Sequence, residues 1–424
     1  MSGILQAVIR DFVTLTHGYW IGLLSGAYAD YGYGVTSDSS GNMYITGMFD
    51  AVQKAVIAKY NSSGVIQWQR QLSSATYDNG NGIAIDSSGN VYIIGLTDIG
   101  GTEGFLIAKY NSSGTIQWQR KLGATSPLTT RGYGIGVDSS GNVYVTGNSS
   151  NNIIIAKYNT SGTIQWQRSL DSADVDYGYA AAVDSSGNVF ITGNFYNTTT
   201  SATNIIIAKY NTSGVIQWQR TLSGAGSGYG IAVDSSGNVY AVGYNSTSGT
   251  ADMLIVKYNT SGTILWQHTL STQLDYAQGV SIDSSNNVYV IGYTYTGAAG
   301  TEGIVIAKYN SSGTIQWQRK LNSSNTDIGY GISVNGTGDI YLTGVTGISN
   351  NDIIFAKLPA DGSLTGSYTV GGVSFTYSAS SLTDAVSSLS FSTSTLTDAA
   401  SSLTAATSTL TDSASSLTST VTQI

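Results

Sequence analysis

A repeat of about fifty residues is the feature that most constrains the fold of this chain. The stretch YNSSGTIQWQRKL occupies residues 110–122 and returns unchanged at 309–321. Two series of residues keep step with it. The first is Trp68, Trp118, Trp166, Trp218, Trp266 and Trp317, and the second is Asp38, Asp86, Asp138, Asp184, Asp234 and Asp283, with Asn335 at the seventh place. A period of this length is typical of propellers and solenoids.

Each repeat contains four short segments with the composition of β-strands. In the second repeat they are GIAIDS, NVYIIG, GFLIAKY and TIQWQRKL, which are rich in β-branched and aromatic residues. Two connections recur: DSSGN joins the first two segments, and NSSG or NTSG joins the last two. Asx–Gly pairs favour tight hairpins. The pattern predicts an all-β chain, a seven-bladed β-propeller of four-stranded antiparallel blades. A solenoid is the alternative, and the hairpins disfavour it.

Closure of the ring can be inferred by counting strands. Seven innermost strands begin near Tyr33, Asn81, Tyr133, Tyr179, Tyr229, Gln278 and Tyr330, but only six outermost strands carry the Trp–Gln pattern. Trp20 lies 18 residues before Asp38, which is also the offset from Trp68 to Asp86. We therefore expect YWIGLLS, residues 19–25, to complete the seventh blade, with SLTGSYTV at 363–370 as the alternative. Joining the first and last blades would protect an exposed sheet edge.

The two ends of the chain differ from the repeats. Residues 1–18 are interpreted as an N-terminal arm and residues 19–370 as the propeller. In residues 371–424, leucines recur every seven positions, at Leu382, Leu389, Leu396, Leu403, Leu410 and Leu417. Such a spacing predicts an α-helical coiled-coil stalk. A disordered Ser/Thr linker and a β-structured fibre shaft are the alternatives. A homo-oligomer is expected, and a trimer is assumed by analogy with fibrous attachment proteins.

Several repeats resemble the bacterial and archaeal β-propeller repeat family called SBBP. The resemblance rests on GIGVDSSGNVYVTG at 134–147, followed by IIIAKYNTSG at 153–162 and a Trp-containing strand. It covers roughly residues 19–358 and implies the propeller fold. It implies no activity, because the family is defined by its repeat.

Composition excludes several classes of function. Charged residues make up 10% of the chain and the net charge is −8, so there is no basic patch for nucleic acid. There is no cysteine, no apolar run long enough to span a membrane is found, and no secretory signal is expected. The histidines are His17 and His268, and the glutamates are Glu103 and Glu302. We predict no catalytic residues, no metal and no cofactor, and interpret DSSGN as a turn and not a calcium loop.

Cations repeat with the blades and are expected to be structural. The lysines that recur once per blade are Lys59, Lys109, Lys157, Lys209, Lys257, Lys308 and Lys357, and the arginines that follow a Trp are Arg70, Arg120, Arg168, Arg220 and Arg319. Stacking of such a cation on the Trp of a neighbouring blade is one form this contact could take. The tyrosines at the start of the innermost strands are expected to pack at the strand entry.

Binding is expected in the loops that vary from blade to blade. Both recurring hairpins emerge on one face, which leaves the variable loops together on the other face. The residues selected as ligand contacts are Tyr77, Asp78, Asp176, Tyr177, Phe195, Tyr196, Tyr244, Asp275, Tyr276, Tyr293 and Tyr295. Aromatic rings beside carboxylates and amides suit sugars or a polar protein surface.

These observations predict a non-enzymatic surface-recognition protein. A propeller head on a stalk resembles the attachment fibre of a virus, which would bind a host-surface glycan or protein and contact other virion proteins through the arm or the stalk. The expected location is the virion surface, or alternatively the cell exterior. A cell-surface or S-layer-associated adhesin is the first alternative function, and a glycan-processing enzyme is the second.

Overall fold

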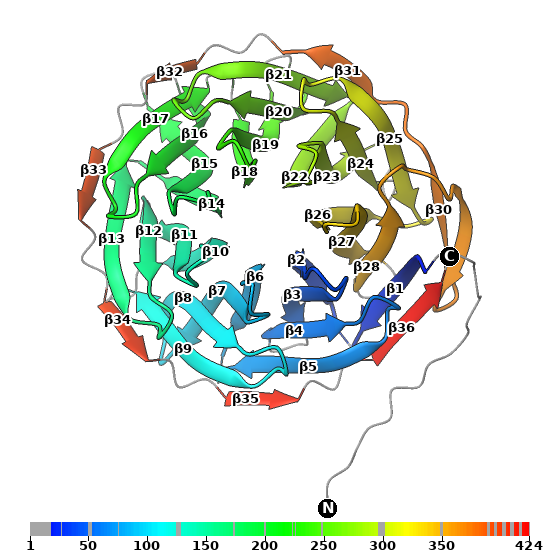
Figure 1. Ribbon diagram of the computed structural model, residues 1–424, viewed down its shortest axis with the longest axis horizontal. Helices are drawn as coiled ribbons and strands as arrows, with labels where there is room; N and C mark the ends of the chain where they lie inside the picture. Colours follow the sequence, from blue (N-terminus) through cyan, green and yellow to red (C-terminus); the bar gives the residue numbers. More distant parts are fainter. Residues whose placement is uncertain are drawn as a thin grey trace, which may run out of the picture.

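The computed structural model describes residues 18–26, 28–49, 53–74, 76–123, 129–172, 174–198, 201–222, 224, 226–246, 249–295, 302–347, 351–387, 391–393, 397–400, 404–407, 411–414 and 418–423. Seven antiparallel sheets stand radially around a central channel (Figure 1). The predicted seven-bladed β-propeller with four-stranded blades is therefore confirmed. No helix long and apolar enough to cross a membrane occurs in the described part of the chain.

The first four blades follow one another along the chain, each built from the channel outward. Blade 1 contains β2 (Tyr31–Ser37), β3 (Met43–Phe49), β4 (Lys54–Tyr60) and β5 (Ile66–Ser73). Blade 2 contains β6 (Asp78–Ile85), β7 (Val91–Ile99), β8 (Thr102–Tyr110) and β9 (Ile116–Gly123). Blade 3 contains β10 (Thr130–Val137), β11 (Val143–Ser149), β12 (Asn152–Tyr158) and β13 (Ile164–Asp171). Blade 4 contains β14 (Asp176–Val183), β15 (Val189–Asn197), β16 (Ala202–Tyr210) and β17 (Ile216–Leu222).

The last three blades continue this order until the ring closes. Blade 5 contains β18 (Gly226–Val233), β19 (Val239–Asn245), β20 (Asp252–Tyr258) and β21 (Ile264–Ser271). Blade 6 contains β22 (Leu274–Ile282), β23 (Val288–Tyr295), β24 (Gly303–Tyr309) and β25 (Ile315–Asn322). Blade 7 contains β26 (Asp327–Val334), β27 (Asp339–Thr346) and β28 (Asp352–Pro359) from one end of the ring, and β1 (Trp20–Ser25) from the other.

The seventh blade joins the two ends of the propeller. Strand β1 pairs antiparallel with β28, with Trp20 opposite Lys357 and Leu24 opposite Ile353. Trp20 is fully buried. The alternative segment for this place forms β29 (Gly366–Val370), which pairs with β30 (Val373–Ala379) at the outer edge of blade 6.

Neighbouring blades are locked together at the outer rim by a repeated set of contacts. Trp118 of blade 2 donates its indole N–H to the carbonyl of Thr160 in blade 3, at 3.0 Å, and Arg120 Nε donates to the carbonyl of Gly162 at 2.8 Å. Gly162 has φ of +74°, and an added Cβ would lie 2.7 Å from the Trp118 ring. The turn therefore requires glycine both for its backbone conformation and for this close approach.

Cations do lie over aromatic rings, but the prediction that each ring is the Trp of a neighbouring blade is wrong. The Arg120 guanidinium lies 5.6 Å from the ring of Trp118, which belongs to the same strand. Residues two apart on a strand point to the same face, so the two side chains lie side by side. The ammonium of Lys109 lies 5.1 Å from the ring of Tyr92, also in its own blade. Contact with the next blade runs through backbone carbonyls instead.

The recurring DSSGN connections are tight turns closed by their aspartate. In blade 2, Asp86 accepts hydrogen bonds from the amides of Ser88 and Asn90, from the Asn90 side chain and from the hydroxyl of Tyr92, at 2.8 to 2.9 Å. These bonds occupy both carboxylate oxygens and hold the pKa of Asp86 below its usual value even though burial opposes them. Among the described residues, no group of three His, Cys, Asp or Glu is placed to hold a metal ion.

The C-terminal segment corrects the prediction for residues 371–424. Its described residues form no coiled coil; they form strands that add a fifth strand to every blade. After β30 on blade 6 come β31 (Thr383–Val386) on blade 5, β32 (Phe391–Thr393) on blade 4, β33 (Thr397–Ala400) on blade 3, β34 (Thr404–Thr407) on blade 2, β35 (Thr411–Ala414) on blade 1 and β36 (Thr418–Gln423) on blade 7. We call β31–β36 the C-terminal belt (Figure 1).

The seven-residue period of the belt is the spacing between blades. Strands β33, β34, β35 and β36 begin seven residues apart, and each pairs with the next blade around the ring. Seven extended residues span at most about 23 Å, and that length carries the chain from one blade to its neighbour. Leu382 is buried in the hydrophobic cluster that Trp266 and Ile315 also pack against. The other five leucines of the period lie outside the described residues.

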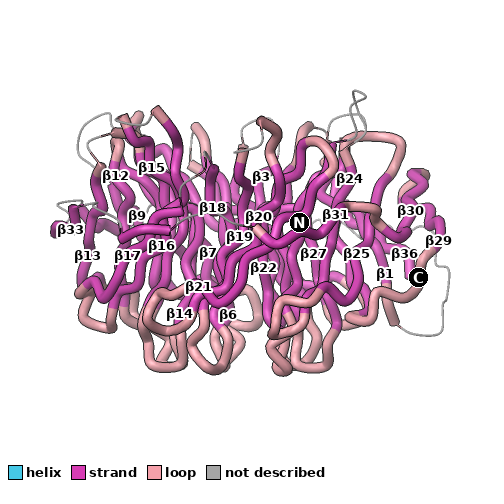
Figure 2. The backbone as a smooth tube through the Cα atoms, turned by 90° about the horizontal axis from the view of Figure 1, so that it is seen from above, coloured by secondary structure: helices cyan, strands magenta, loops and turns pink. Residues whose placement is uncertain are grey.

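The order of strands separates two kinds of loop onto opposite faces. Because each blade alternates in direction from the channel outward, the DSSGN and NSSG or NTSG turns lie together on one face. The connections between blades and those between the two middle strands lie on the other, which we call the variable face. Figure 2 shows the ring from its side, with loops projecting from both faces. The N-terminal arm predicted for residues 1–18 lies outside the described residues except for Gly18.

Candidate functional site: the mouth of the central channel

A β-bulge in the innermost strand of every blade aims one side chain at the channel axis. In blade 3 the pairing of β10 with β11 shifts between Gly132 and Gly134, so Tyr133 has no partner in the ladder. The same shift occurs in all seven innermost strands. A bulge bends its strand and re-aims the side chain of the extra residue. The bulged residues are Tyr33, Asn81, Tyr133, Tyr179, Tyr229, Gln278 and Tyr330, which we call the mouth ring.

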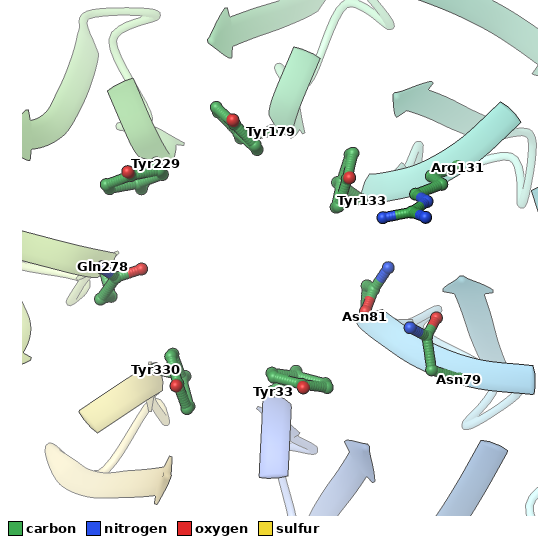
Figure 3. A pocket seen from close by; sticks show the side chains of 9 residues that line it. All are labelled: Tyr33, Asn79, Asn81, Arg131, Tyr133, Tyr179, Tyr229, Gln278 and Tyr330. Carbon is green, nitrogen blue, oxygen red and sulfur yellow. The ribbon is translucent and has the colours of Figure 1, made fainter. Parts of the chain in front are cut away.

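The mouth ring opens into a cavity of about 350 Å³ at the centre of the variable face. The ring residues line this cavity together with Asn79 and Arg131, and Figure 3 shows all nine side chains around one central opening. The volume is in the range of sites that bind small molecules. The expectation that the ring tyrosines only pack at the strand entry is therefore incomplete, because they also form the wall of a cavity.

Aromatic contacts hold the ring tyrosines in place. Tyr179 lies between Tyr133 and Tyr229, with ring centroids 5.3 and 5.1 Å away. Tyr33 contacts Tyr330 in a T-shaped arrangement at 5.4 Å. Offset and edge-to-face arrangements at these distances are the favourable ones for aromatic pairs. The wall of the cavity is thus pre-organised over blades 3, 4 and 5 and over blades 7 and 1.

A second set of tyrosines extends this wall onto the rim. Tyr177 stacks on Tyr179 at 5.6 Å. Tyr229 stacks on Tyr244, which contacts Tyr276 at 4.9 Å, and Tyr276 stacks on Tyr293 at 5.1 Å. The result is an arc of half-buried rings leading from the mouth over blades 5 and 6. Four residues selected from the sequence, Tyr177, Tyr244, Tyr276 and Tyr293, are therefore brought together with the mouth.

Two positions interrupt the tyrosine ring with amides. Asn81 replaces tyrosine in blade 2 and donates from its side chain to the carbonyl of Gly132, at 2.7 Å. Gln278 replaces tyrosine in blade 6. Beside Asn81, Asn79 accepts a hydrogen bond from the backbone of Leu96 at 2.9 Å and is largely buried. We call the part of the mouth formed by Asn79, Asn81 and Arg131 the polar notch.

Arg131 supplies a charge to the polar notch. Its side chain is 43% exposed, and its Nε lies 3.5 Å from Oε2 of Glu103. Its guanidinium faces the opening near Tyr133 and Asn81 (Figure 3). Arg131 lies two residues before the bulge, where the other blades carry Tyr31, Asn79, Tyr177, Ser227, Tyr276 and Ile328. No other blade places a cation at this position.

Burial keeps the ring hydroxyls protonated. Loss of solvent around the rings raises the pKa of Tyr229 and of Tyr330 to about 12. Burial also raises the pKa of Tyr33, Tyr133 and Tyr179, although the guanidinium of Arg131 opposes this at Tyr133. At neutral pH each hydroxyl can therefore both donate and accept a hydrogen bond.

Three carboxylates selected as ligand contacts are instead buried loop anchors. Asp78, Asp176 and Asp275 are at most 1% exposed. Asp176 accepts hydrogen bonds from the amide of Ser172 at 2.8 Å and from its hydroxyl at 2.6 Å. Asp275 accepts from the amide of Thr272 at 2.6 Å, and Asp78 accepts from the amide of Ser74. Each closes the loop that enters its blade, so the prediction of ligand contact is corrected for these three residues.

The remaining selected residues divide by exposure. Phe195 is 7% exposed and packs with Ile153 and Leu170 in the core between blades 3 and 4, which removes it from the predicted contact set. Tyr196, the next residue, is 38% exposed on the variable face. Tyr77 and Tyr295 are half-buried there, and the Tyr77 hydroxyl accepts a long hydrogen bond of 3.5 Å from Asn79.

The sequence-based selection did not include Asn79, Asn81, Arg131 and Gln278, which line the cavity. The available signal was in the sequence: Asn81 and Gln278 replace the tyrosine found in the other five blades, and Arg131 is the one cation at a position that is neutral in the other six. Choosing residues from the loops that vary between blades identified residues on the rim. The cavity wall is instead formed by residues of the innermost strands, which a β-bulge turns toward the channel.

Comparison with known proteins supports the fold. The family model "SBBP: Beta-propeller repeat" matches residues 67–101, 117–155 and 217–245. Among curated proteins, none matches the sequence significantly. A polysaccharide lyase of family PL25, an ulvan lyase, is similar in structure with a TM-score of 0.50 and 11% identity over 80% of this chain and 96% of its own. Sqt1 from Chaetomium thermophilum, bound to the N-terminus of ribosomal protein L10, gives a TM-score of 0.46 and 12% identity over 80% and 98%.

A gluconolactonase from Xanthomonas campestris is also similar, with a TM-score of 0.40 and 10% identity over 77% of this chain and 97% of its own. At 11% identity, the likeness to the ulvan lyase supports the fold alone.

Proposed function

We propose that this chain, whose repeats belong to the SBBP β-propeller family, is a non-enzymatic recognition protein that binds its ligand at the channel mouth. The observation that carries the proposal is the wall of the cavity, which consists of tyrosines, amides and one arginine on a rigid ring. Such side chains offer flat faces and hydrogen bonds. The nearby aspartates are committed to their loops, with Asp176 and Asp275 fully buried.

A host-surface glycan is the ligand class that this wall suits best. Tyrosine rings present apolar faces to the C–H faces of a sugar, while their hydroxyls and the neighbouring amides match its hydroxyl groups. The aromatic arc through Tyr244, Tyr276 and Tyr293 continues from the mouth and would accommodate further sugar units. A polar protein surface is the other partner that these side chains could bind.

In the proposed role the propeller is the receptor-binding head of a virion attachment protein. A ring with one variable face and one face of uniform turns can bind with the first and leave the second free. Contacts with other virion proteins would then involve the arm or the turn face, because the belt lies on the rim of its own propeller. Electron microscopy of native particles tests this role: discs at the particle periphery support it, and discs on the host envelope would favour an adhesin.

Binding itself can be tested with purified protein on a glycan array and on host cells. Tyr179→Ala combined with Tyr229→Ala removes two adjacent walls of the cavity and is expected to abolish binding. Gln217→Ala, at an exposed position of the turn face, is the matched control and should bind as the wild type does. Retention of full binding by the double variant, or release of shortened glycan products, would contradict the proposal.

A further inference from the structure

We infer that the polar notch binds the carboxylate of an acidic sugar, with Arg131 as the anchor. This inference rests on the proposed function, since it names the ligand class of the same site. It starts from charge: of the residues that line the cavity, Arg131 alone is charged, and the others are tyrosines and amides. A ligand that fills this cavity therefore meets a single positive charge on one side of the mouth.

Arg131 pairs with Glu103 through Nε and shares a hydrogen bond with the hydroxyl of Tyr133, and its remaining guanidinium N–H groups would bind a planar anion. Glu103 approaches the Nε atom, at 3.5 Å, and this pair holds the side chain over the rim of blade 3. The guanidinium then faces the opening near Tyr133 (Figure 3). A guanidinium binds a carboxylate through two parallel N–H···O bonds, and this fork matches a carboxylate better than an ammonium does.

Partial neutralisation by Glu103 argues for one negative charge on the ligand and against several. A diphosphate or a polysulfate would bring two or more charges to one guanidinium that already has a carboxylate beside it. Such ligands are bound by clusters of cations or by arrays of backbone N–H groups. The described mouth has Arg131 and no second lining cation, so a monocarboxylate fits its charge.

The surroundings of Arg131 fit a sugar ring attached to that carboxylate. Asn81 donates its side-chain N–H to Gly132, so its oxygen remains as an acceptor at the notch. The protonated hydroxyl of Tyr133 lies beside the guanidinium of Arg131. This positive charge lowers the pKa of Tyr133, while burial raises it. Tyr179 and Tyr229 continue the wall with aromatic faces. A hydrogen-bond acceptor, a hydrogen-bond donor and an apolar aromatic face thus surround the Arg131 guanidinium. Recognition of a uronic or sialic acid requires this combination.

The polar notch also predicts that each propeller binds the acidic end of one glycan. Six of the seven positions equivalent to Arg131 carry a neutral residue, and the amides at Asn81 and Gln278 are the two interruptions of the tyrosine ring. A site that followed the repeat would occur seven times. This one occurs once, in the part of the mouth between blades 2 and 3, and the remaining arc of tyrosines leads away from it.

The test measures binding of uronic-acid-terminated and sialic-acid-terminated oligosaccharides against their carboxyl-reduced counterparts. The wild type is expected to bind one of the acidic series at least 10-fold more tightly than the reduced series. Arg131→Gln should abolish that preference, and Arg131→Lys should restore only part of it. Glu103→Gln should tighten acidic binding, since it removes the competing carboxylate. Thermal melting shows that each variant is folded.

The outcomes separate this inference from the proposed function. Equal binding of acidic and reduced sugars by the wild type, or an unchanged preference in Arg131→Gln, overturns the inference and leaves glycan recognition standing. A wild type that binds no glycan and no host cell overturns both. Preference for one series over the other identifies which class of acidic sugar the polar notch accepts. Either preference supports the inference.

Discussion

Replacement of Asp176 by asparagine should change how the stability of the propeller depends on pH. The carboxyl group is buried, and this burial raises its pKa from 3.8 to about 7 although Ser172 donates two hydrogen bonds to it. In the unfolded chain the group returns to its ordinary pKa. The folded state therefore binds the proton more tightly than the unfolded state does between these two pKa values.

The sign and size of the effect follow from that difference. The stabilisation is complete below pH 3.8 and is lost as the pH rises toward 7, because ionisation of the buried group becomes a cost of folding. Each pKa unit corresponds to about 1.4 kcal/mol. Between pH 5 and pH 8 the wild type should lose about 2.5 kcal/mol of unfolding free energy through this one group. Asparagine resembles the protonated form and does not ionise, so the Asp176→Asn variant should escape this loss.

Urea unfolding at pH 5 and pH 8, at one ionic strength, measures the difference between wild type and variant. The unfolding free energy of Asp176→Asn, relative to that of the wild type, should rise by about 2.5 kcal/mol between pH 5 and pH 8. Asp361→Asn is the control: Ser363 donates a hydrogen bond to Asp361 and holds its pKa below the usual value, so the group is ionised throughout this range. If the unfolding free energies of Asp176→Asn and the wild type differ by the same amount at pH 5 and pH 8, the assignment of Asp176 as a buried, protonated loop anchor is refuted.

Two further predictions concern the C-terminal belt. Leu382, which immediately precedes β31, is buried in the hydrophobic cluster that Trp266 and Ile315 pack against. Leu382→Ala should therefore lower the unfolding free energy by about 2 to 4 kcal/mol; chemical denaturation measures it, and a loss below about 0.5 kcal/mol would contradict the packing. Truncation after residue 387 should expose the outer strands of five blades, which are β17, β13, β9, β5 and, in blade 7, β1; light scattering should then show association that rises with concentration. A truncated chain as monodisperse as the full chain would contradict the pairing of the belt.

Most of the scaffold was predictable because its signals are local and repeated. The DSSGN turn recurs in five blades and a Trp-containing strand in all seven, so the copies reinforce one another. The offset from Trp20 to Asp38 equals the offset from Trp68 to Asp86 and identifies the displaced strand. The pairing of β1 with β28 follows from counting strands and from the need to cover an edge. None of these inferences required knowledge of which side chains meet across the ring.

The belt was not predictable, because its period has two physical meanings. Leucine every seven residues marks the seam of a coiled coil when the chain is helical. When the chain is extended, the same seven residues span about 23 Å, and here they lead from one blade to the next. The composition of Ser and Thr favours neither meaning by itself. Only the neighbouring propeller, which offers an unpaired outer strand at each step, decides between them.

The candidate site was only partly predictable, because burial and strand geometry override loop chemistry. Asp78 and Asp275 have the residue type of a ligand contact, yet the loops need their carboxylates and keep them from solvent. Arg131 has the residue type of an ordinary strand cation, yet it lies two residues before a bulge and faces the cavity. Residue type and loop position are therefore weaker guides here than the register of the innermost strands.

A repeat protein separates the residues that build it from the residues that distinguish one blade from another. Contacts such as that of Trp118 with Thr160 recur because every blade must be joined to the next. A residue that departs from the repeat is not needed for this joining, so another constraint must account for it. At the channel mouth, Asn81, Gln278 and Arg131 depart from the repeat and line a single cavity. Departures gathered around one cavity are what a binding site requires, and departures scattered over the ring would have carried no such implication.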